Sequence, residues 1–213
     1  MIEILGGLSR GIGTTVAITL LSFALGSILA IPLVALRRSP KRVLRWTGAA
    51  AIEVIRSIPP IVWLMFIFLG VGSDLVRLDT FQAAVAGFSI ISAAYIAEIY
   101  RSAIDAVPAG QWEAAKALSL RTLPTYVRVI LPQAVLLMIP ASATYLIGLF
   151  KDSAIASVIG AQDITFFAFQ SARITGEGLT VFLLAAAMYL VLSIPVAIIA
   201  RASGAWVERK LVR

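Results

Sequence analysis

Cysteine and histidine are both absent from the 213-residue sequence. Without cysteine the chain has neither a disulfide framework nor a thiolate metal site. Without histidine it lacks the commonest general base and the commonest metal ligand. No nucleophile–base pair or metal-binding cluster stands out among the remaining residues, so we expect no catalytic residues and no metal or other cofactor bound by this chain.

Charged residues are also scarce, at 14% of the sequence, while 60% of the residues are hydrophobic and the mean hydropathy is +0.97. A soluble domain contains about 45–50% apolar residues. The apolar residues here form long uncharged blocks, which is typical of a chain surrounded by lipid. The net charge of +7 is compatible with nucleic-acid binding. The distribution of basic residues between the loops instead favours a membrane protein that binds no nucleic acid.

Five apolar runs are long enough to cross a hydrocarbon core of ~30 Å as helices. The expected spans are about 11–36, 52–73, 80–101, 129–150 and 178–202. Helices are expected because a backbone in lipid must satisfy its own hydrogen bonds, and the alternation of a barrel strand is absent. The first ten residues lack the basic segment of a signal peptide, so we expect the first span to be retained. The sequence thus predicts an all-α membrane protein with five transmembrane helices in one domain, 1–213.

Basic residues are concentrated in three segments. If the chain crosses the membrane five times, all three segments lie on the same side. These segments are the loop after the first span, the loop at about 102–128 and the C-terminal tail. The first loop has no acidic residue and carries Arg37, Arg38, Lys41, Arg42 and Arg45. The positive-inside rule therefore predicts an external N-terminus and a cytoplasmic C-terminus. The uncharged run 153–162 is too short to span and is expected to be a re-entrant or interfacial segment packed against protein.

The loop at about 102–128 is predicted to form short helices at the cytoplasmic surface. Residues 108–110 (Pro-Ala-Gly) form a turn, and good helix formers occupy 111–120. A second helical stretch over about 124–131 is expected to stop at Pro132, because a residue before proline is disfavoured in the α region. The composition of this loop, taken alone, is also typical of an ordinary interfacial loop.

The spacing of residues in this loop resembles the EAA motif of binding-protein-dependent ABC importer permeases. That motif reads Glu-Ala-Ala, three residues, Gly, nine residues, Ile, one residue, Leu-Pro. Its positions are occupied here without a gap by Glu113-Ala114-Ala115, Ser119, Val129 and Leu131-Pro132. Ser119 stands where the family has glycine, and Val129 where it has isoleucine. Because a non-glycine residue resists positive φ, Ser119 makes a left-handed turn costlier.

The resemblance covers nearly the whole chain and is closest to the polar amino-acid uptake branch of that family. The other segments similar to that branch are 53–59, 94–101, 150–153 and 208–211. The resemblance implies the type I ABC importer permease fold, a place in the bacterial cytoplasmic (inner) membrane, and transport by alternating access.

The same resemblance implies several partners. The residues expected to dock on a separate ABC ATPase dimer, which binds ATP and Mg, are Gln111, Glu113, Ala114, Ala115 and Ser119. The chain has no GxxxxGK[ST] loop, so ATP hydrolysis is expected on that partner. A second permease subunit, identical or homologous, and an extracytoplasmic solute-binding protein complete the expected assembly.

Ionisable residues at the span ends are candidates for gating or for the solute path, since charge within a membrane is costly and often functional. Glu53 and Arg56, like Glu98 and Arg101, are spaced i, i+3, which permits an ion pair on one helix face. Such pairs either anchor the spans or line the path. The remaining path candidates are Tyr95, Thr144, Tyr145, Gly148, Lys151 and Asp152. Family members often carry asparagine at the position of Thr144, so an opine-like or compatible-solute substrate stays open beside an amino acid.

Two other classes of membrane protein are less consistent with the sequence. An ion-coupled secondary transporter is expected to show inverted repeats and an acid near the membrane midplane, and neither is apparent. A non-transporting membrane subunit leaves the helical cytoplasmic loop unexplained. The sequence therefore favours the permease subunit of an ATP-driven importer for amino acids or similar small polar zwitterions.

Overall fold

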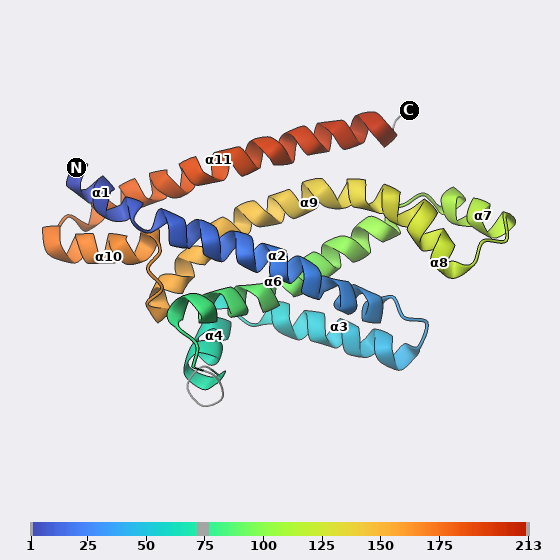
Figure 1. Ribbon diagram of the computed structural model, residues 1–213, viewed down its shortest axis with the longest axis horizontal. Coiled ribbons are helices and arrows are strands. Elements are labelled where there is room, and N and C mark those ends of the chain that lie inside the picture. The colour runs from blue at the N-terminus through green and yellow to red at the C-terminus, as the bar shows by residue number, and fades with distance from the viewer. Residues whose placement is uncertain (1, 72–76, 212–213) are drawn as a thin grey trace.

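The computed structural model describes residues 2–71 and 77–211, with side chains described for 3–70 and 77–204. These residues form helices and no strand, which confirms the all-α prediction (Figure 1). Within the described residues, four helices are long and apolar enough to cross a membrane, and a fifth span results if one bent pair of helices is counted as a single span.

Two long helices form the centre of the bundle. α2 (Ile12–Arg37) follows the short α1 (Ile2–Ser9), and α6 (Thr80–Asp105) packs along α2 over much of its length. α6 begins at a capping box, in which the Asp79 carboxylate accepts from the Gln82 N–H at 2.7 Å. The two helices approach closely at Gly26, where an added Cβ would lie 2.4 Å from the Cβ of Ser92. α6 is the most deeply buried of the candidate spans.

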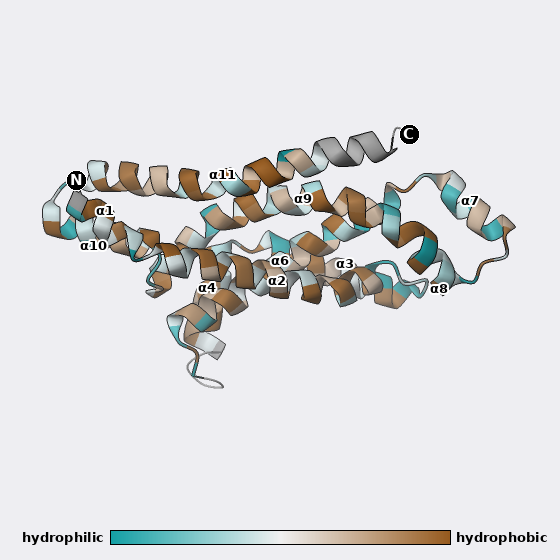
Figure 2. Ribbon diagram, turned by 45° about the horizontal axis from the view of Figure 1, so that its top comes forward, coloured by the Kyte–Doolittle hydropathy of each residue, from teal (hydrophilic) through white to brown (hydrophobic). Residues whose placement is uncertain are grey.

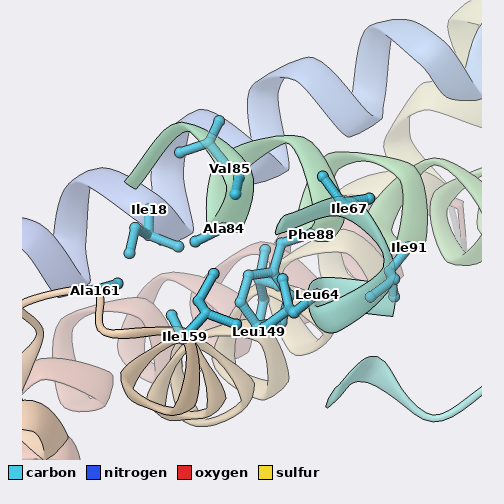
Figure 3. Close-up of a cluster of buried hydrophobic side chains, with 12 residues drawn as sticks. Ile18, Leu64, Ile67, Ala84, Val85, Phe88, Ile91, Leu149, Ile159 and Ala161 are labelled. Carbon is cyan, nitrogen blue, oxygen red and sulfur yellow. The ribbon is translucent and has the colours of Figure 1, made fainter. Parts of the chain in front are cut away.

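The main hydrophobic core lies where five elements converge on α6 (Figure 3). Phe88 is its largest fully buried side chain. The labelled side chains around it come from α2, from α4 (Pro60–Met65) with the following π-helix η1 (Phe66–Val71), from α9 (Leu131–Asp152) and from η3 (Ser153–Ile159). Burial of these apolar side chains holds the short elements against α6.

The predicted second span, about 52–73, is not one straight helix. α3 (Arg42–Ser57) begins ten residues before that span and ends at Ser57, and α4 begins at Pro60. The axes of the two helices differ by 98°. Pro59 and Pro60 explain the break, because each lacks an N–H and the residue before a proline is pushed out of the α region. Residues 72 and 73 of the predicted span lie outside the described residues.

The segment after the cytoplasmic loop continues into the next long helix. After α7 (Ala109–Ala117) and a short turn, α8 (Thr122–Pro124) begins. α8 continues without a gap into a π-helical stretch, η2 (Thr125–Ile130), and then into α9. The prediction that Pro132 stops this stretch is wrong. A proline ring clashes with the carbonyl four residues earlier in an α-helix, and the wider π turn before Pro132 relieves that clash.

The short uncharged run after α9 packs against protein, as expected. η3 is a 3-10 helix, and α10 (Ile164–Thr175) and α11 (Gly178–Leu211) complete the chain. Asp163 is fully buried at the start of α10, where it accepts from the Phe166 N–H at 2.7 Å and from the Tyr189 hydroxyl of α11 at 3.0 Å. The Ile164 N–H donates to Thr15 Oγ1 of α2 at 3.2 Å. These bonds connect α10 to two long helices.

The short elements lie at opposite ends of the bundle. α7, α8, the α2–α3 connection and the end of α11 lie at one end, called the α7 end, while α1 and α10 lie at the other, called the α10 end (Figure 1). The long helices between them are mostly hydrophobic (Figure 2). The basic residues of the α2–α3 loop therefore lie at the same end as α7.

Candidate functional site

The first candidate site is the turn that ends α7. The Leu120 N–H donates to the Ala115 carbonyl at 3.0 Å, and the Ser119 N–H donates to the Lys116 carbonyl at 2.8 Å. This pair of bonds is a Schellman motif, with Ser119 at the position that usually holds glycine. Ser119 has a φ of 53°, and no other non-glycine residue in the described chain has positive φ. The glycine position of the motif therefore forms a left-handed turn with serine, although serine makes such a turn costlier.

Contacts with the following helix hold α7 in place. The rings of Trp112 and Tyr126 meet edge to face, with centroids 5.3 Å apart. Ala115 is buried at 2% exposure. Gln111, Glu113 and Ala114 are exposed on the outside of this arrangement. Of the five residues predicted to dock on another protein, Ala115 faces the chain itself and the others, including Ser119, remain accessible.

Exposed leucines beside α7 were missed by sequence reasoning. Leu118 and Leu123 are each 73% exposed, and Leu120 is 37% exposed. Leu118 and Leu120 lie in the turn between α7 and α8, and Leu123 lies in α8 itself. All three are apolar side chains beside polar residues of the same loop. The sequence does contain an indication of them, because the Leu-x-Leu-x-x-Leu spacing over 118–123 does not place the three leucines on one face of a helix, where they could be buried together. Exposed leucines at the tip of a protruding loop are typical of a protein interface.

Ion pairs join the ends of α2 and α6 at the α7 end. The Arg101 Nε donates to Glu98 at 2.9 Å, so the predicted pair on α6 is formed. Arg101 also pairs with Asp105, and Asp105 in turn accepts from Arg38. Partial burial lowers the pKa of Arg38, but hydrogen bonds to Asp105 and Tyr126 outweigh it, and the pKa lies above its usual value. The arginine therefore stays charged in this network.

The second candidate site is a cavity of about 460 Å³ between α3, α6 and α9. Its aromatic wall is formed by Tyr95, and the Tyr95 ring stacks on the Tyr145 ring behind it with centroids 5.5 Å apart. The Arg56 guanidinium lies over the Tyr95 ring, 5.0 Å from its centroid. The Tyr145 hydroxyl donates to Ser92 Oγ at 2.9 Å, which fixes the stacked pair. The cavity is lined by Arg56, Tyr95, Glu98, Ile99, Ser102, Ala103, Ala106, Leu137 and Ala141.

This cavity offers groups of both charges to a small solute. Arg56 makes no ion pair among the described residues, and the hydrogen bonds that join Glu98 to Arg101 use only Oε1 of the carboxylate. A carboxylate is bound well by a guanidinium, and an ammonium is attracted both to a carboxylate oxygen and to an aromatic face. The arrangement is therefore suited to a zwitterion. The i, i+3 pair expected between Glu53 and Arg56 is not formed in the described structure, because Arg56 turns to Tyr95 instead.

The remaining path candidates do not line this cavity. The Thr144 hydroxyl donates back to the Pro140 carbonyl at 3.0 Å, and Gly148 has open space where a Cβ would stand. Lys151 and Asp152 are exposed at the far end of α9, about 15 Å along the helix from the cavity residue Ala141. No group of three or more possible metal ligands occurs among the described residues.

Comparison with known proteins relates this architecture to one family. The family model described as "Binding-protein-dependent transport system inner membrane component" matches residues 12–211. The chain belongs to this family. It is 35% identical over 184 residues to the probable amino-acid ABC transporter permease protein YckA of Bacillus subtilis (strain 168), covering 84% of this chain and 80% of YckA. It is 36% identical over 203 residues to the arginine transport system permease protein ArtQ of the same organism, covering 95% and 91%.

A solved structure is similar to this inner membrane component over its whole fold. The crystal structure of an amino acid ABC transporter with histidines superposes with a TM-score of 0.89 at 30% identity, covering 98% of this chain and 96% of that chain. The chain therefore has the type I ABC importer permease fold. Its relatives are permease proteins of ABC transporters and not enzymes. Both the α7 loop and the cavity lie within the matched residues.

Proposed function

We propose that this chain is the permease subunit of an ATP-driven importer of amino acids or similar small polar zwitterions. The observation that carries the proposal is the α7 loop. The EAA frame there coincides with a helix fixed by Trp112 and Tyr126, a left-handed turn at Ser119, and exposed leucines beside it. The names of YckA and ArtQ support an amino-acid substrate.

The α7 end lies in the cytoplasm in this proposal, and the chain resides in the bacterial inner membrane. The basic residues of the α2–α3 loop lie at that end, where the positive-inside rule places them. The N-terminus is then external and the end of α11 cytoplasmic. The spans are α2, α6, α9, α11 and the bent pair α3–α4.

Three partners complete the transporter. A separate ATPase dimer, which binds ATP and Mg, receives the exposed face of α7, with Glu113 and Leu118 at the contact. A second permease subunit covers the cavity, because Arg56 and Tyr95 are exposed in the single chain and a charge facing lipid is costly. A solute-binding protein delivers the solute at the α10 end.

Transport then proceeds by alternating access. The solute carboxylate binds Arg56, while its ammonium binds the carboxylate of Glu98 through Oε2. Closure of the ATPase dimer moves α7, and Trp112 passes this movement to Tyr126 and so to α9, which forms one wall of the cavity. The movement opens the cavity alternately to either side of the membrane.

The coupling role is tested by Glu113→Lys in transporter reconstituted with its ATPase and binding protein. Uptake of radiolabelled amino acid is expected to fall at least tenfold while the helical content is retained, because the charge is reversed at the docking face. Glu177→Lys is the matched control, since Glu177 is also exposed but lies at the α10 end, away from α7. Co-purification with the ATPase is expected to be retained in this variant and lost in Glu113→Lys. Normal coupled uptake in the Glu113→Lys protein, or uptake driven by a proton or sodium gradient without ATP, contradicts the proposal.

The solute site is tested by Arg56→Gln. At saturating loaded binding protein we expect uptake to fall about tenfold or more, since a hydrogen bond between charged groups is worth about 1.5–3 kcal/mol. Arg42→Gln removes the same charge at the other end of α3 and is expected to transport normally. Equal uptake by both variants excludes Arg56 from the solute path without affecting the coupling role of α7.

A further inference from the structure

A second cavity lies at the α7 end, between the end of α2, α6 and the start of the α8–η2 stretch. Its volume is about 750 Å³. It is separate from the cavity around Tyr95, and the two share no lining residue. Neither the EAA loop nor the solute path accounts for it. We call it the α2 groove.

The α2 groove has a strongly positive polar side. Arg38 and Arg45 line it, together with Ser39, Thr122 and Tyr126, and none of its lining residues is acidic. Arg45 has no side-chain partner among the described residues. Arg38 pairs with Asp105, but Asp105 is shared with Arg101, so one carboxylate faces two guanidinium groups. The net charge beside the groove is therefore positive.

Arg38 also retains an unused donor. Its Nε is buried and has no hydrogen-bond partner in the described part of the chain. A buried donor without an acceptor is destabilising, and more so when the group is charged. A phosphate ester brings several acceptor oxygens and a negative charge, so it would satisfy both the spare donor of this guanidinium and the unpaired Arg45.

The other side of the groove is apolar. Ile31, Val34 and Ala35 of α2 and Ile104 of α6 line it. Ile31 is 57% exposed and lies about 10 Å along the helix axis from Arg38. An apolar wall in the hydrocarbon region that ends in two arginines at the membrane surface matches a phospholipid, with an acyl chain on the wall and the headgroup at the arginines.

We propose that the α2 groove binds one anionic phospholipid through its phosphate, with Arg38 and Arg45 as the headgroup ligands. Basic pockets between helices on the cytoplasmic side of a membrane are suited to such headgroups. Free phosphate shares the headgroup chemistry but leaves the apolar wall uncovered, so we assign the lipid. The assignment rests on the membrane orientation given in the proposed function. Tyr126, which contacts Trp112 of α7, also lines the groove, so the lipid lies against the coupling loop.

The test is native mass spectrometry of the assembled transporter in detergent, titrated with phosphatidylglycerol or phosphatidylcholine. We expect one phosphatidylglycerol per permease to bind at least tenfold more tightly than phosphatidylcholine. Arg45→Gln is expected to weaken phosphatidylglycerol binding about fivefold, since a basic residue near the surface contributes about 1 kcal/mol. Arg45 makes no ion pair, so this variant is expected to fold normally.

Arg42→Gln is the matched control, because Arg42 lies in the same basic loop region but does not line the groove. Equal weakening by Arg42→Gln and Arg45→Gln would show only a diffuse charge effect and overturn the proposal. Displacement of phosphatidylglycerol by 10 mM inorganic phosphate would assign the site to free phosphate and also overturn it. Glu113→Lys is expected to bind the lipid normally, so failure of uptake and failure of lipid binding are separate results.

Discussion

Asp163 gives this protein a stability that depends on pH. Burial raises the pKa of the Asp163 carboxyl from 3.8 to about 6, although the bonds from the Phe166 N–H and the Tyr189 hydroxyl act in the opposite direction. The folded chain thus holds a proton up to about pH 6, whereas the unfolded chain releases it near pH 4. The contribution to stability is complete below the unfolded pKa and is lost as the pH rises through the folded pKa.

The size of this effect follows from the pKa difference. A shift of about 2 units corresponds to about 3 kcal/mol, of which about 2 kcal/mol is lost between pH 4.5 and pH 7.5. For a chain of this length that loss lowers the apparent Tm by about 4–8 °C. The assay is thermal unfolding of the purified permease in detergent at the two pH values, comparing the wild type with Asp163→Asn.

Asparagine keeps the shape and caps a helix as well as aspartate does, so α10 is expected to remain in place. The Asp163→Asn protein is therefore expected to lose the part of the pH dependence that Asp163 contributes, while other groups titrate equally in both proteins. If the Tm difference between pH 4.5 and pH 7.5 is the same in both, the burial argument for Asp163 is refuted.

Two further substitutions test the backbone. Gly26→Ala is expected to destabilise the protein by about 1–3 kcal/mol, because the added Cβ would lie 2.4 Å from the Cβ of Ser92. Gly13→Ala in the same helix is the control and is expected to be neutral or stabilising, because no atom lies within 4 Å of the added Cβ. Equal unfolding temperatures for the two variants would contradict the close packing of α2 on α6. Ser119→Gly removes the strain of positive φ on a non-glycine residue, which costs about 1 kcal/mol. The turn is then more stable, and hydrogen exchange of the Leu120 amide, which donates to Ala115 in this turn, is expected to slow about fivefold. Ser119→Ala retains the strain and serves as its control, and faster exchange in the glycine variant would count against the turn.

Much of the fold could be predicted because each membrane-spanning helix is a single continuous run of apolar residues, which can be found from the sequence of that segment alone. Hydropathy and length are sufficient to place α2, α6, α9 and α11, since each is a long apolar run. The break between α3 and α4 could not be placed in this way. Pro59 and Pro60 predict an interruption, but the 98° bend depends on the packing of α4 and η1 against α6. The π turn before Pro132 likewise depends on how the chain accommodates a proline within a continuing helix.

The features of the candidate sites that depend on residue spacing along the chain could be predicted from the sequence. The features that depend on contacts between distant helices could not. Sequence spacing placed Ser119 at the glycine position of the motif, although it left the geometry of the turn open, and it permitted the Glu98–Arg101 pair that is formed. It did not predict that Arg56 would turn to Tyr95, because that contact joins α3 and α6, which are far apart in the chain. The role of Thr144, Gly148, Lys151 and Asp152 stays a prediction.

The unbroken helical path from Thr122 through η2 to Asp152 has a mechanical consequence. At 1.5 Å per residue it is a rod of about 45 Å, fastened to α7 at one end and continuing into η3 at the other. The rod packs against both α11 and α6, and in the proposed transport cycle we expect it to act as a lever that turns about these contacts. A small tilt imposed at the α7 end therefore reappears, with opposite sign, at the α10 end, and the compliant points along the lever are the π turn and Pro140.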